Sequence, residues 1–495
     1  MTDQVISDYR AGDNRVDGHP AHNHQADNYQ ADNYRAAIAA ALAGGWRVRA
    51  LYAAADGKAV RVVLSEPGGR TMVQTARADG TGSVPSIVDL APAVAWDERE
   101  AHDLYGLSFA GHHPMRSLAD HSVPLAEWTV PVHGHDPYQV AVGPIHAGVI
   151  ESGHFRFHVV GDRILHLDTR LFYKHRGLER AAEGGTIGRA LGAISRACAA
   201  CAVANTVAFA TAAEQALGLR IAPGTARARA LLLELERLWN HLNDIAAVCA
   251  GVGMAAGGAY FLALTERARR LNATVTGHRF LFGSVQAGGN ALTLDAGDIR
   301  GCADEIAGLR SAAEVGWREL TFNSSFTGRL HGVGIVDAAA VARLGVVGPA
   351  ARAAGVAQDA RTASPYPGYQ DFSPVLASTA AGDVAARFEQ RMLELRQTFG
   401  ILQVLLGDGP VAPASVLTDQ SAGPGQPVGV GLVESPRGAT TCVVECSGDL
   451  VGRVRLRTGS YANWPAVAHA AAGSLLPDFP LINKSFELCY ACADR

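Results

Sequence analysis

Residues 195–201 read SRACAAC and residues 489–495 read CYACADR, and these two stretches organise the interpretation of the whole chain. Each contains two cysteines separated by two residues, a spacing at which both sulfur atoms can face one ion from a turn or the start of a helix. Thiolates are soft ligands that suit nickel, iron, zinc or copper(I). The two pairs therefore predict one metal site with four thiolates.

The separation of the two pairs along the chain argues against a small zinc module, in which the pairs usually lie about 15–20 residues apart. A site built from both pairs would join two remote parts of a large fold. It would also tie the segment after residue 488, which would otherwise fray, into the core. The alternative is two unrelated pairs, one buried and one exposed.

The composition is that of a packed globular protein. Of the 495 residues, 48% are apolar and 18% are charged, and a chain of this length usually forms two or three domains. The net charge of −4 gives no indication of a nucleic-acid partner. No apolar run is long enough to span a membrane, and the polar N-terminal stretch lacks the apolar segment of a signal peptide.

The first part of the chain divides into a polar tail, a small module and a connector. Residues 1–35 repeat the sequence QADNY and predict a disordered tail, in which His19, His22 and His24 are more simply solvated side chains than metal ligands. Residues 36–118 predict a small α/β module, with a helix near 34–43 and strands at 46–52 and 59–64. A connector containing proline and histidine follows at 119–140.

Residues 141–495 predict an α+β domain with a central helical bundle. Leucines 231, 235, 238 and 242 recur at helical spacing and indicate a packed helix over 226–250. Next to them runs a polar stripe, for which a solvated helix face is one interpretation; it consists of Glu234, Arg237, His241 and Asp244. The predicted strands are 153–160, 163–168, 428–433, 441–445 and 451–456. The remaining cysteines are predicted to be small buried hydrophobes; they are Cys249, Cys302, Cys442 and Cys446.

Taken together, these motifs resemble the large subunit of membrane-associated group 4 nickel–iron hydrogenases of the formate hydrogenlyase type. The resemblance covers nearly everything past residue 35. Arg176-Gly-Leu-Glu179 precedes SRACAAC at the family's spacing, CYACADR resembles the second cysteine motif, and residues 143–155 resemble the family's opening strand motif. Residues 96–116 resemble the 30-kDa subunit of respiratory complex I, and fusion of that module to a hydrogenase-like large subunit is typical of formate hydrogenlyase proteins.

The resemblance implies a role for each cysteine of the two pairs. Cys198 and Cys489 would be terminal nickel ligands, and Cys201 and Cys492 would bridge nickel and iron. Carbon monoxide and cyanide would complete the ligands of the iron, so the implied cofactor is a nickel–iron centre that splits hydrogen heterolytically.

The resemblance also implies roles for four further residues, because they occupy matching positions in the family's motifs. Glu151 would be the proton-relay carboxylate beside a terminal cysteine, since burial can raise a carboxyl pKa toward the working pH. Arg437, in Glu434-Ser-Pro-Arg-Gly, would face cyanide and the open metal position. Ser460 would donate its hydroxyl to a cyanide, and Glu179 would be a carboxylate near the buried C-terminal segment. For each of these four residues a purely structural role is the alternative.

The sequence departs from the family pattern at several positions around the cysteines. Ala199 replaces a glycine, Asn205 replaces a histidine, Glu487-Leu488 replaces Asp-Pro and Gly459 replaces a proline. No residue follows Arg495 in this sequence, whereas many family members carry a C-terminal extension that a protease removes. All four cysteines are nevertheless present.

The implied function is that of the catalytic subunit of a multi-subunit oxidoreductase that interconverts hydrogen with protons and electrons. The main alternative is a complex I-like quinone-reductase module, which also has a histidine at the position of His146. A third interpretation is a non-catalytic scaffold subunit stabilised by a bound zinc ion. Cys442 and Cys446 are a lone pair, so iron–sulfur clusters are expected only in partner subunits.

The implied partners are a small subunit with a four-iron–four-sulfur cluster, a ferredoxin-like subunit and membrane subunits related to proton pumps, with a formate dehydrogenase as a further candidate. Formate chemistry would belong to that partner, because nothing here resembles a molybdopterin or selenocysteine site. The expected location is the cytoplasmic, inner face of the cell membrane, with the subunit bound peripherally.

Overall fold

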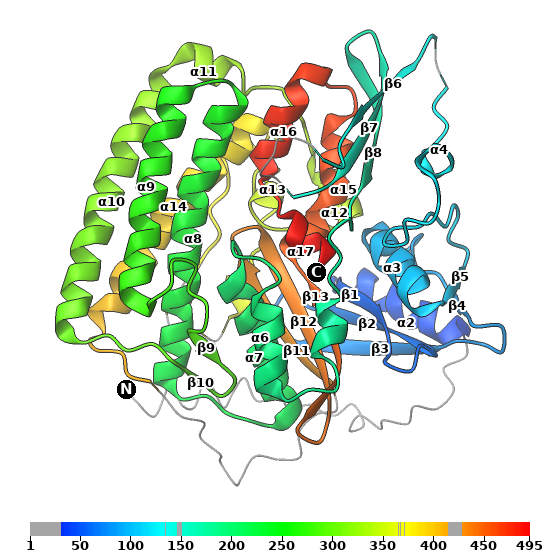
Figure 1. The fold of residues 1–495 in the computed structure, drawn as a ribbon, viewed down its shortest axis with the longest axis horizontal. Coiled ribbons are helices and arrows are strands. Elements are labelled where there is room, and N and C mark those ends of the chain that lie inside the picture. The colour runs from blue at the N-terminus through cyan, green and yellow to red at the C-terminus, as the bar shows by residue number, and fades with distance from the viewer. Residues whose placement is uncertain are drawn as a thin grey trace.

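A computed structural model describes residues 31–133, 135–145, 151–364, 366, 368–370, 372–413 and 428–495. Residues 1–30 of the predicted tail, with their three histidines, and His146 lie outside this part of the chain. The described part combines a helical bundle, several small sheets and a set of short C-terminal helices that lie between the bundle and the N-terminal module (Figure 1). The predicted α+β class is confirmed.

The N-terminal module is an antiparallel sheet with strand order β1-β2-β3, two helices and a short parallel pair of strands. Its elements are α2 (Ala31–Ala43), β1 (Arg47–Ala53), β2 (Ala59–Ser65), β3 (Thr71–Arg77), β4 (Ser83–Pro85), α3 (Ala95–Tyr105) and β5 (Ser108–Ala110). Residues 31–35, part of the predicted tail, belong to α2. Most of the buried apolar side chains between Tyr34 and Phe109 form a cluster of their own.

The predicted connector is only partly irregular. It contains a short helix, α4 (Leu125–Trp128), and its last residues begin the strand β6 (Tyr138–Val142). β6 pairs with β7 (His154–Val160), which pairs with β8 (Arg163–Arg170), and all three strands are antiparallel. The last three residues of the predicted connector, 138–140, are therefore extended because they pair with β7.

Long helices form the bundle on one side of the molecule (Figure 1). They are α8 (Pro223–Gly251), α9 (Ala255–Thr276), α10 (Ala296–Phe322) and α14 (Val384–Gly407). Proline suits the first position of α8, where its missing N–H would have no helical partner, and α10 begins with a capping box between Asp295 and Asp298. The shorter elements of this part of the chain are α5 (Leu178–Ala182), β9 (Val285–Gln286), β10 (Gly289–Asn290), α11 (Ser324–Gly328), α12 (Ala338–Leu344) and α13 (Pro349–Arg352).

The polar stripe of α8 is buried. Glu234, Arg237, His241 and Asp244 are each at most 1% exposed. The interpretation as a solvated helix face is therefore wrong: the periodicity that marks an apolar face cannot show that other elements cover the polar face as well. Of the four cysteines expected to be buried, Cys446 is only half-buried.

A second antiparallel sheet, β11-β12-β13, packs directly on helix α7 (Ala202–Leu217). Its strands are β11 (Val428–Ser435), β12 (Gly438–Ser447) and β13 (Leu450–Arg457). A Cβ atom at Gly429 or Gly431 would lie 1.8 or 1.9 Å from the carbonyl oxygen of Ala212 or Ala208. Glycines on the strand and alanines on the helix thus allow the two backbones to approach closely.

The sheet of the N-terminal module packs on this second sheet. Ala50, Tyr52 and Val63 form an apolar cluster with Val443, and the hydroxyl of Tyr52 donates to Glu445 Oε1 at 3.0 Å. The N-terminal module is therefore tied to the strands that precede the C-terminal cysteines. Within the described residues, no helix is long and apolar enough to cross a membrane.

Candidate metal centre

The four predicted cysteines meet in space. The sulfur atoms of Cys198, Cys201, Cys489 and Cys492 all lie within 4.8 Å of one another. Three of these cysteines are buried and Cys489 is half-buried. Among the described residues, no other group of three or more cysteine, histidine or acidic side chains is gathered in this way. Four convergent sulfurs are the donor set that a soft metal requires, so the residues present fit a thiolate-bound centre.

The first pair lies between α6 (Ile187–Ser195) and the start of α7. The Ala200 amide donates to Cys198 Sγ at 3.3 Å. Asn205, which takes the place of the family's histidine, lies with its amide nitrogen 4.0 Å from Cys492 Sγ. The asparagine therefore still presents an N–H group toward a sulfur of the cluster.

Helix α8 holds the turn that carries the first pair. The carboxylate of Glu236 accepts hydrogen bonds from Val203 N at 2.6 Å and Ala204 N at 3.0 Å, in the first turn of α7. Asn240, one turn further along α8, donates to Ala200 O at 2.8 Å. Sequence reasoning missed both residues, because capping by a side chain from another helix leaves no local signal.

The second pair follows α16 (Phe479–Phe486) and opens the short helix α17 (Tyr490–Asp494). The start of α15 (Gly459–Ala471) holds it in place. The Cys489 amide donates to Ser460 Oγ at 3.0 Å, and Thr458 Oγ1 donates to Cys492 O at 3.0 Å. Ser460 thus lies beside the cluster, where its oxygen accepts the Cys489 hydrogen bond and its own hydroxyl hydrogen remains available to donate.

Glu151 lies against the second pair. Its Oε2 accepts a hydrogen bond from the Ala491 amide at 2.5 Å. Burial raises the pKa of this carboxyl, and the Ala491 hydrogen bond partly opposes the shift. The position next to the cysteines and the raised pKa are the two properties expected of a proton-relay carboxylate.

Arg437 lies in the turn between β11 and β12 and is buried. Burial disfavours its charge, but Asp244 on α8 raises its pKa, and the thiols of Cys489 and Cys201 add to this effect. Nη1 of Arg437 lies 2.7 Å from Asp244 Oδ2. Arg391 on α14 approaches the same oxygen at 3.2 Å.

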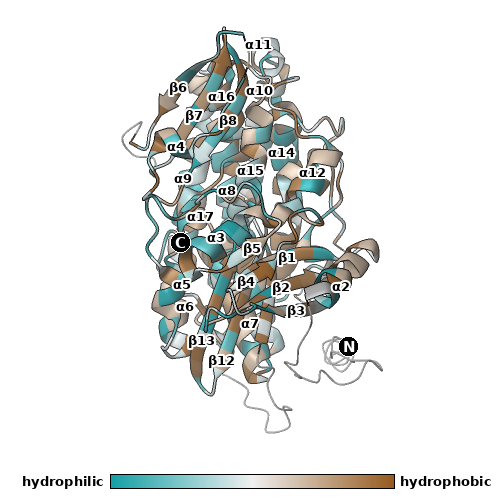
Figure 2. Ribbon diagram, turned by 90° about the vertical axis from the view of Figure 1, so that its right-hand side faces the viewer, coloured by the Kyte–Doolittle hydropathy of each residue, from teal (hydrophilic) through white to brown (hydrophobic). Residues whose placement is uncertain are grey.

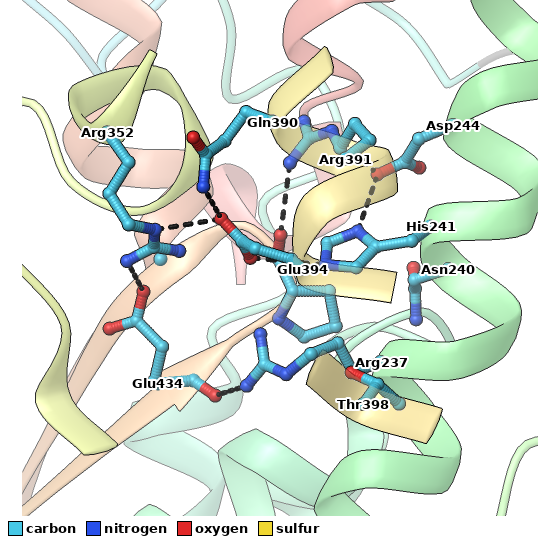
Figure 3. A network of polar contacts seen from close by, with 12 residues as sticks. Arg237, Asn240, His241, Asp244, Arg352, Gln390, Arg391, Glu394, Thr398 and Glu434 are labelled. Atoms are coloured by element: carbon cyan, nitrogen blue, oxygen red, sulfur yellow. Dashed lines mark hydrogen bonds and ion pairs between the residues drawn. The ribbon is translucent and has the colours of Figure 1, made fainter. Parts of the chain in front are cut away.

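The polar stripe of α8 continues into a buried network of hydrogen bonds and ion pairs (Figure 3). His241 Nε2 lies 3.2 Å from Glu394 Oε2 on α14, and Glu394 Oε1 lies 2.8 Å from Arg352 Nε. Arg352 Nη1 reaches Glu434 Oε1 at 2.9 Å, just before the turn with Arg437. The network connects α8, α14 and β11, so it fixes the elements that carry Asp244, Arg391 and Arg437.

Glu179 lies in a different group of charges, close to residue 495. Its Oε1 accepts from the Leu456 amide at 2.9 Å and lies 3.4 Å from Arg495 Nε. The structure thus places it near the C-terminal segment, as expected, and surrounds it with arginines of β13.

Two family descriptions match the chain. "Respiratory-chain NADH dehydrogenase, 30 Kd subunit" matches residues 39–131, and "Respiratory-chain NADH dehydrogenase, 49 Kd subunit" matches residues 251–425. Formate hydrogenlyase subunit 5 of Escherichia coli (strain K12) is 30% identical over 446 residues, which cover 83% of this chain and 77% of that protein. The chain belongs to the formate hydrogenlyase subunit 5 family of hydrogenase large subunits.

Members of this family are related to complex I proteins as well. The C/D component of NADH-quinone oxidoreductase from Rhodopseudomonas palustris (strain BisB5) is 26% identical over 477 residues, covering 83% of this chain and 82% of that protein. A solved structure of a membrane-bound sulfane sulfur reductase, an archaeal respiratory membrane complex, superposes with a TM-score of 0.66 at 26% identity, covering 73% of this chain and 99% of that one. The predicted resemblance, and with it an oxidoreductase related to membrane respiratory complexes, is confirmed.

Proposed function

We propose that this chain is the catalytic large subunit of a membrane-associated hydrogenase complex of the formate hydrogenlyase type, which interconverts hydrogen with protons and electrons. The observation that carries the proposal is the convergence of four cysteine sulfurs within 4.8 Å from two remote parts of the chain. A complex I-like subunit that reduces quinone has no need for such a cluster.

The cysteines would hold a nickel–iron centre whose iron also carries carbon monoxide and cyanide. Cys198, Cys201, Cys489 and Cys492 would supply the four thiolates that hold the two metals. When bound, the centre supplies heterolytic cleavage of hydrogen.

Side chains of the protein would transfer the proton of this reaction and supply the charges around the centre. Glu151 accepts and releases the proton; its raised pKa and its contact with the Ala491 amide support this role. Arg437, oriented by Asp244, would provide a fixed positive charge and N–H donors beside the centre. Ser460 orients the Cys489 backbone and offers its hydroxyl hydrogen to a cyanide. Glu179 holds the C-terminal segment through Arg495.

The complex that this subunit needs follows from the absence of a second cysteine cluster in the described residues. Electrons would leave through a small subunit with a four-iron–four-sulfur cluster and a ferredoxin-like subunit. Membrane subunits related to proton pumps would anchor the complex at the inner, cytoplasmic face of the membrane, and a formate dehydrogenase is the candidate electron donor. In this proposal the N-terminal module spans residues 36–118, the connector spans 119–140 and the hydrogenase-like domain spans 141–495.

A quinone-reductase function is the second candidate. The similarity to the C/D component of NADH-quinone oxidoreductase, which extends over both parts of the chain, supports it. A third candidate is a scaffold that binds only zinc. All three predict a folded subunit in a larger complex, so metal content separates them.

The deciding experiment is metal analysis of the complex purified from its natural host. We expect about one nickel per chain and infrared bands of carbon monoxide and cyanide, both lost in Cys492→Ser. Cys302→Ser removes a buried cysteine in α10, outside the cluster, and should retain the nickel. Zinc alone, or no metal from a host with working maturation enzymes, would contradict the nickel–iron assignment.

A further inference from the structure

Buried charges lie where helix α3 of the N-terminal module meets the segment that carries the second cysteine pair. Glu100 on α3, Arg455 on β13 and Arg495 are 4%, 2% and 1% exposed. Figure 2 shows α3 as a mainly hydrophilic helix beside α17. Since charged side chains are rarely buried without partners, the contacts between these groups define the interface.

Glu100 is shared by two guanidinium groups. Nη2 of Arg495 donates to both of its carboxylate oxygens at 2.6 Å, and Nη1 of Arg455 donates to Oε1. Burial opposes ionisation, but the two arginines outweigh it and hold the pKa of Glu100 at about 2. The neighbouring acid on α3, Asp97, is occupied by Arg455 and Arg457, so it does not substitute for Glu100.

Arg495 links this interface to the cysteines. Its backbone N–H donates to Ala491 O at 3.0 Å, so it closes the turn that contains Cys492. Its side chain lies over the ring of Tyr461 at 4.6 Å, next to Ser460, and donates to Leu456 O at 2.5 Å. A change in the position of Arg495 would therefore be transmitted to α17.

Helix α17 is held from two sides. Asp494 accepts from Phe172 N at 2.7 Å and Lys174 N at 3.0 Å, which are contacts within the hydrogenase-like part of the chain. Glu100 holds the other side from the N-terminal module. Without Glu100, Arg495 would keep the ion pair with Glu179 at 3.4 Å but lose its closer carboxylate partner at 2.6 Å, so its buried positive charge would be compensated less well.

We propose that Glu100 is a positioning residue for the four-cysteine centre: through Arg495, the N-terminal module holds α17 and thereby sets the placement of Cys489 and Cys492. The module is thus an integral part of the metal site. The inference deepens the proposed function and rests on it, because it takes the four cysteines to be the metal ligands.

The test compares thiol reactivity in the full-length, metal-free chain, using iodoacetamide and mass spectrometry to measure alkylation at each cysteine. Removing one partner of a buried ion pair is strongly destabilising locally, so Glu100→Gln should accelerate alkylation of Cys489 and Cys492 at least about tenfold. Alkylation of Cys249 in α8 reports global opening and should keep its rate. Glu100→Asp, which keeps the charge, should restore part of the protection.

Glu98→Gln is the matched control. Glu98 is buried on the same helix, but it bonds only within the N-terminal module, to Ser86 Oγ, Ile87 N and His112. An equal effect of Glu98→Gln, or a parallel acceleration at Cys249, would show general loosening and overturn the proposal. Because Glu100 acts through Arg495, Glu100→Gln and Arg495→Gln should not be additive; additive effects would also overturn it.

The result separates this inference from the proposed function. Binding of cobalt(II) provides a second readout, since the thiolate-to-cobalt absorption reports the four-sulfur geometry without nickel. The inference would be supported if the parent chain is alkylated slowly and gives a cobalt signal, and if Glu100→Gln is alkylated faster and gives a weaker signal. This holds even if the native complex contains no nickel. Nickel in the complex, with alkylation unchanged in Glu100→Gln, would refute the inference and leave the proposed function standing.

Discussion

Nη1 of Arg437 lies 2.7 Å from Oδ2 of Asp244, and both side chains are buried. The arginine comes from the turn after β11, whereas the aspartate comes from the middle of α8, far away in the sequence. Burial works against the aspartate charge, but Arg437 and Arg391 outweigh it and lower the pKa of Asp244. The acid thus fixes both the orientation and the charge of the arginine beside the cysteines.

Asp244→Asn should lower hydrogen turnover by about 10–100-fold, the usual effect of removing a partner that orients groups at a metal site. The amide keeps the shape of the side chain but removes the charge that orients Arg437. Nickel content should stay normal, because the four sulfurs are untouched. Hydrogen-oxidation assays and metal analysis of the same preparation check both statements.

Glu305→Gln is the control for Asp244→Asn. It breaks an ion pair with Arg267 in which both side chains are more than one-third exposed. Such surface pairs contribute little, so turnover should not change. Full activity of Asp244→Asn would show that Arg437 needs no partner on α8.

Glu236→Gln should flatten the pH dependence of stability. Burial raises the pKa of Glu236 from 4.5 to about 8. Between these values the folded chain binds more protons than the unfolded chain, so the free energy of unfolding falls as pH rises, by up to about 1.4 kcal/mol per unit. Glutamine cannot titrate, so this contribution disappears in the variant.

The measurement is the midpoint of thermal unfolding at several pH values between 5 and 8. The parent chain should lose more stability over this window than Glu236→Gln. Glu319→Gln alters an exposed carboxylate on α10 and should follow the parent chain. Parallel curves for all three proteins would rule out the raised pKa.

Gly431→Ala should destabilise the protein by about 3 kcal/mol, at the upper end of overpacking effects. The new Cβ atom would lie 1.9 Å from Ala208 O and would push β11 away from α7. Chemical or thermal unfolding measures the loss. Gly400→Ala in α14, where no atom lies within 4 Å of an added Cβ, should instead be neutral or stabilise by up to about 1 kcal/mol.

Gly459→Ala should reduce stability by about 1–3 kcal/mol and lower activity, because a Cβ atom there would lie 2.8 Å from the Arg437 carbonyl carbon. The close approach of the Arg437 turn therefore leaves room for glycine but not for a Cβ atom at this position. Gly301→Ala, on exposed α10 with open space around it, is the control for unfolding and turnover. Unchanged turnover in Gly459→Ala would show that the Arg437 turn tolerates displacement.

Elements and chemistry that depend on local spacing can be predicted from the amino-acid sequence. Hydrophobic periodicity repeats within a few residues, so it predicted the long helix around 226–250 and the strands at 153–160, 163–168, 428–433, 441–445 and 451–456. The two cysteine pairs were recognisable for the same reason: each is complete within four residues. Their motifs also carried the resemblance that the comparisons confirm.

Only the tertiary structure decided which groups meet across the fold. Glu236 caps α7 from another helix, Glu100 binds Arg495 from another module, and the polar stripe of α8 is covered by α14 and β11. Such contacts join residues that are hundreds of positions apart or on separate elements, and no periodicity encodes them. Whether a charged residue is solvated or paired in the core depends on what packs over it, which is a property of the assembled chain.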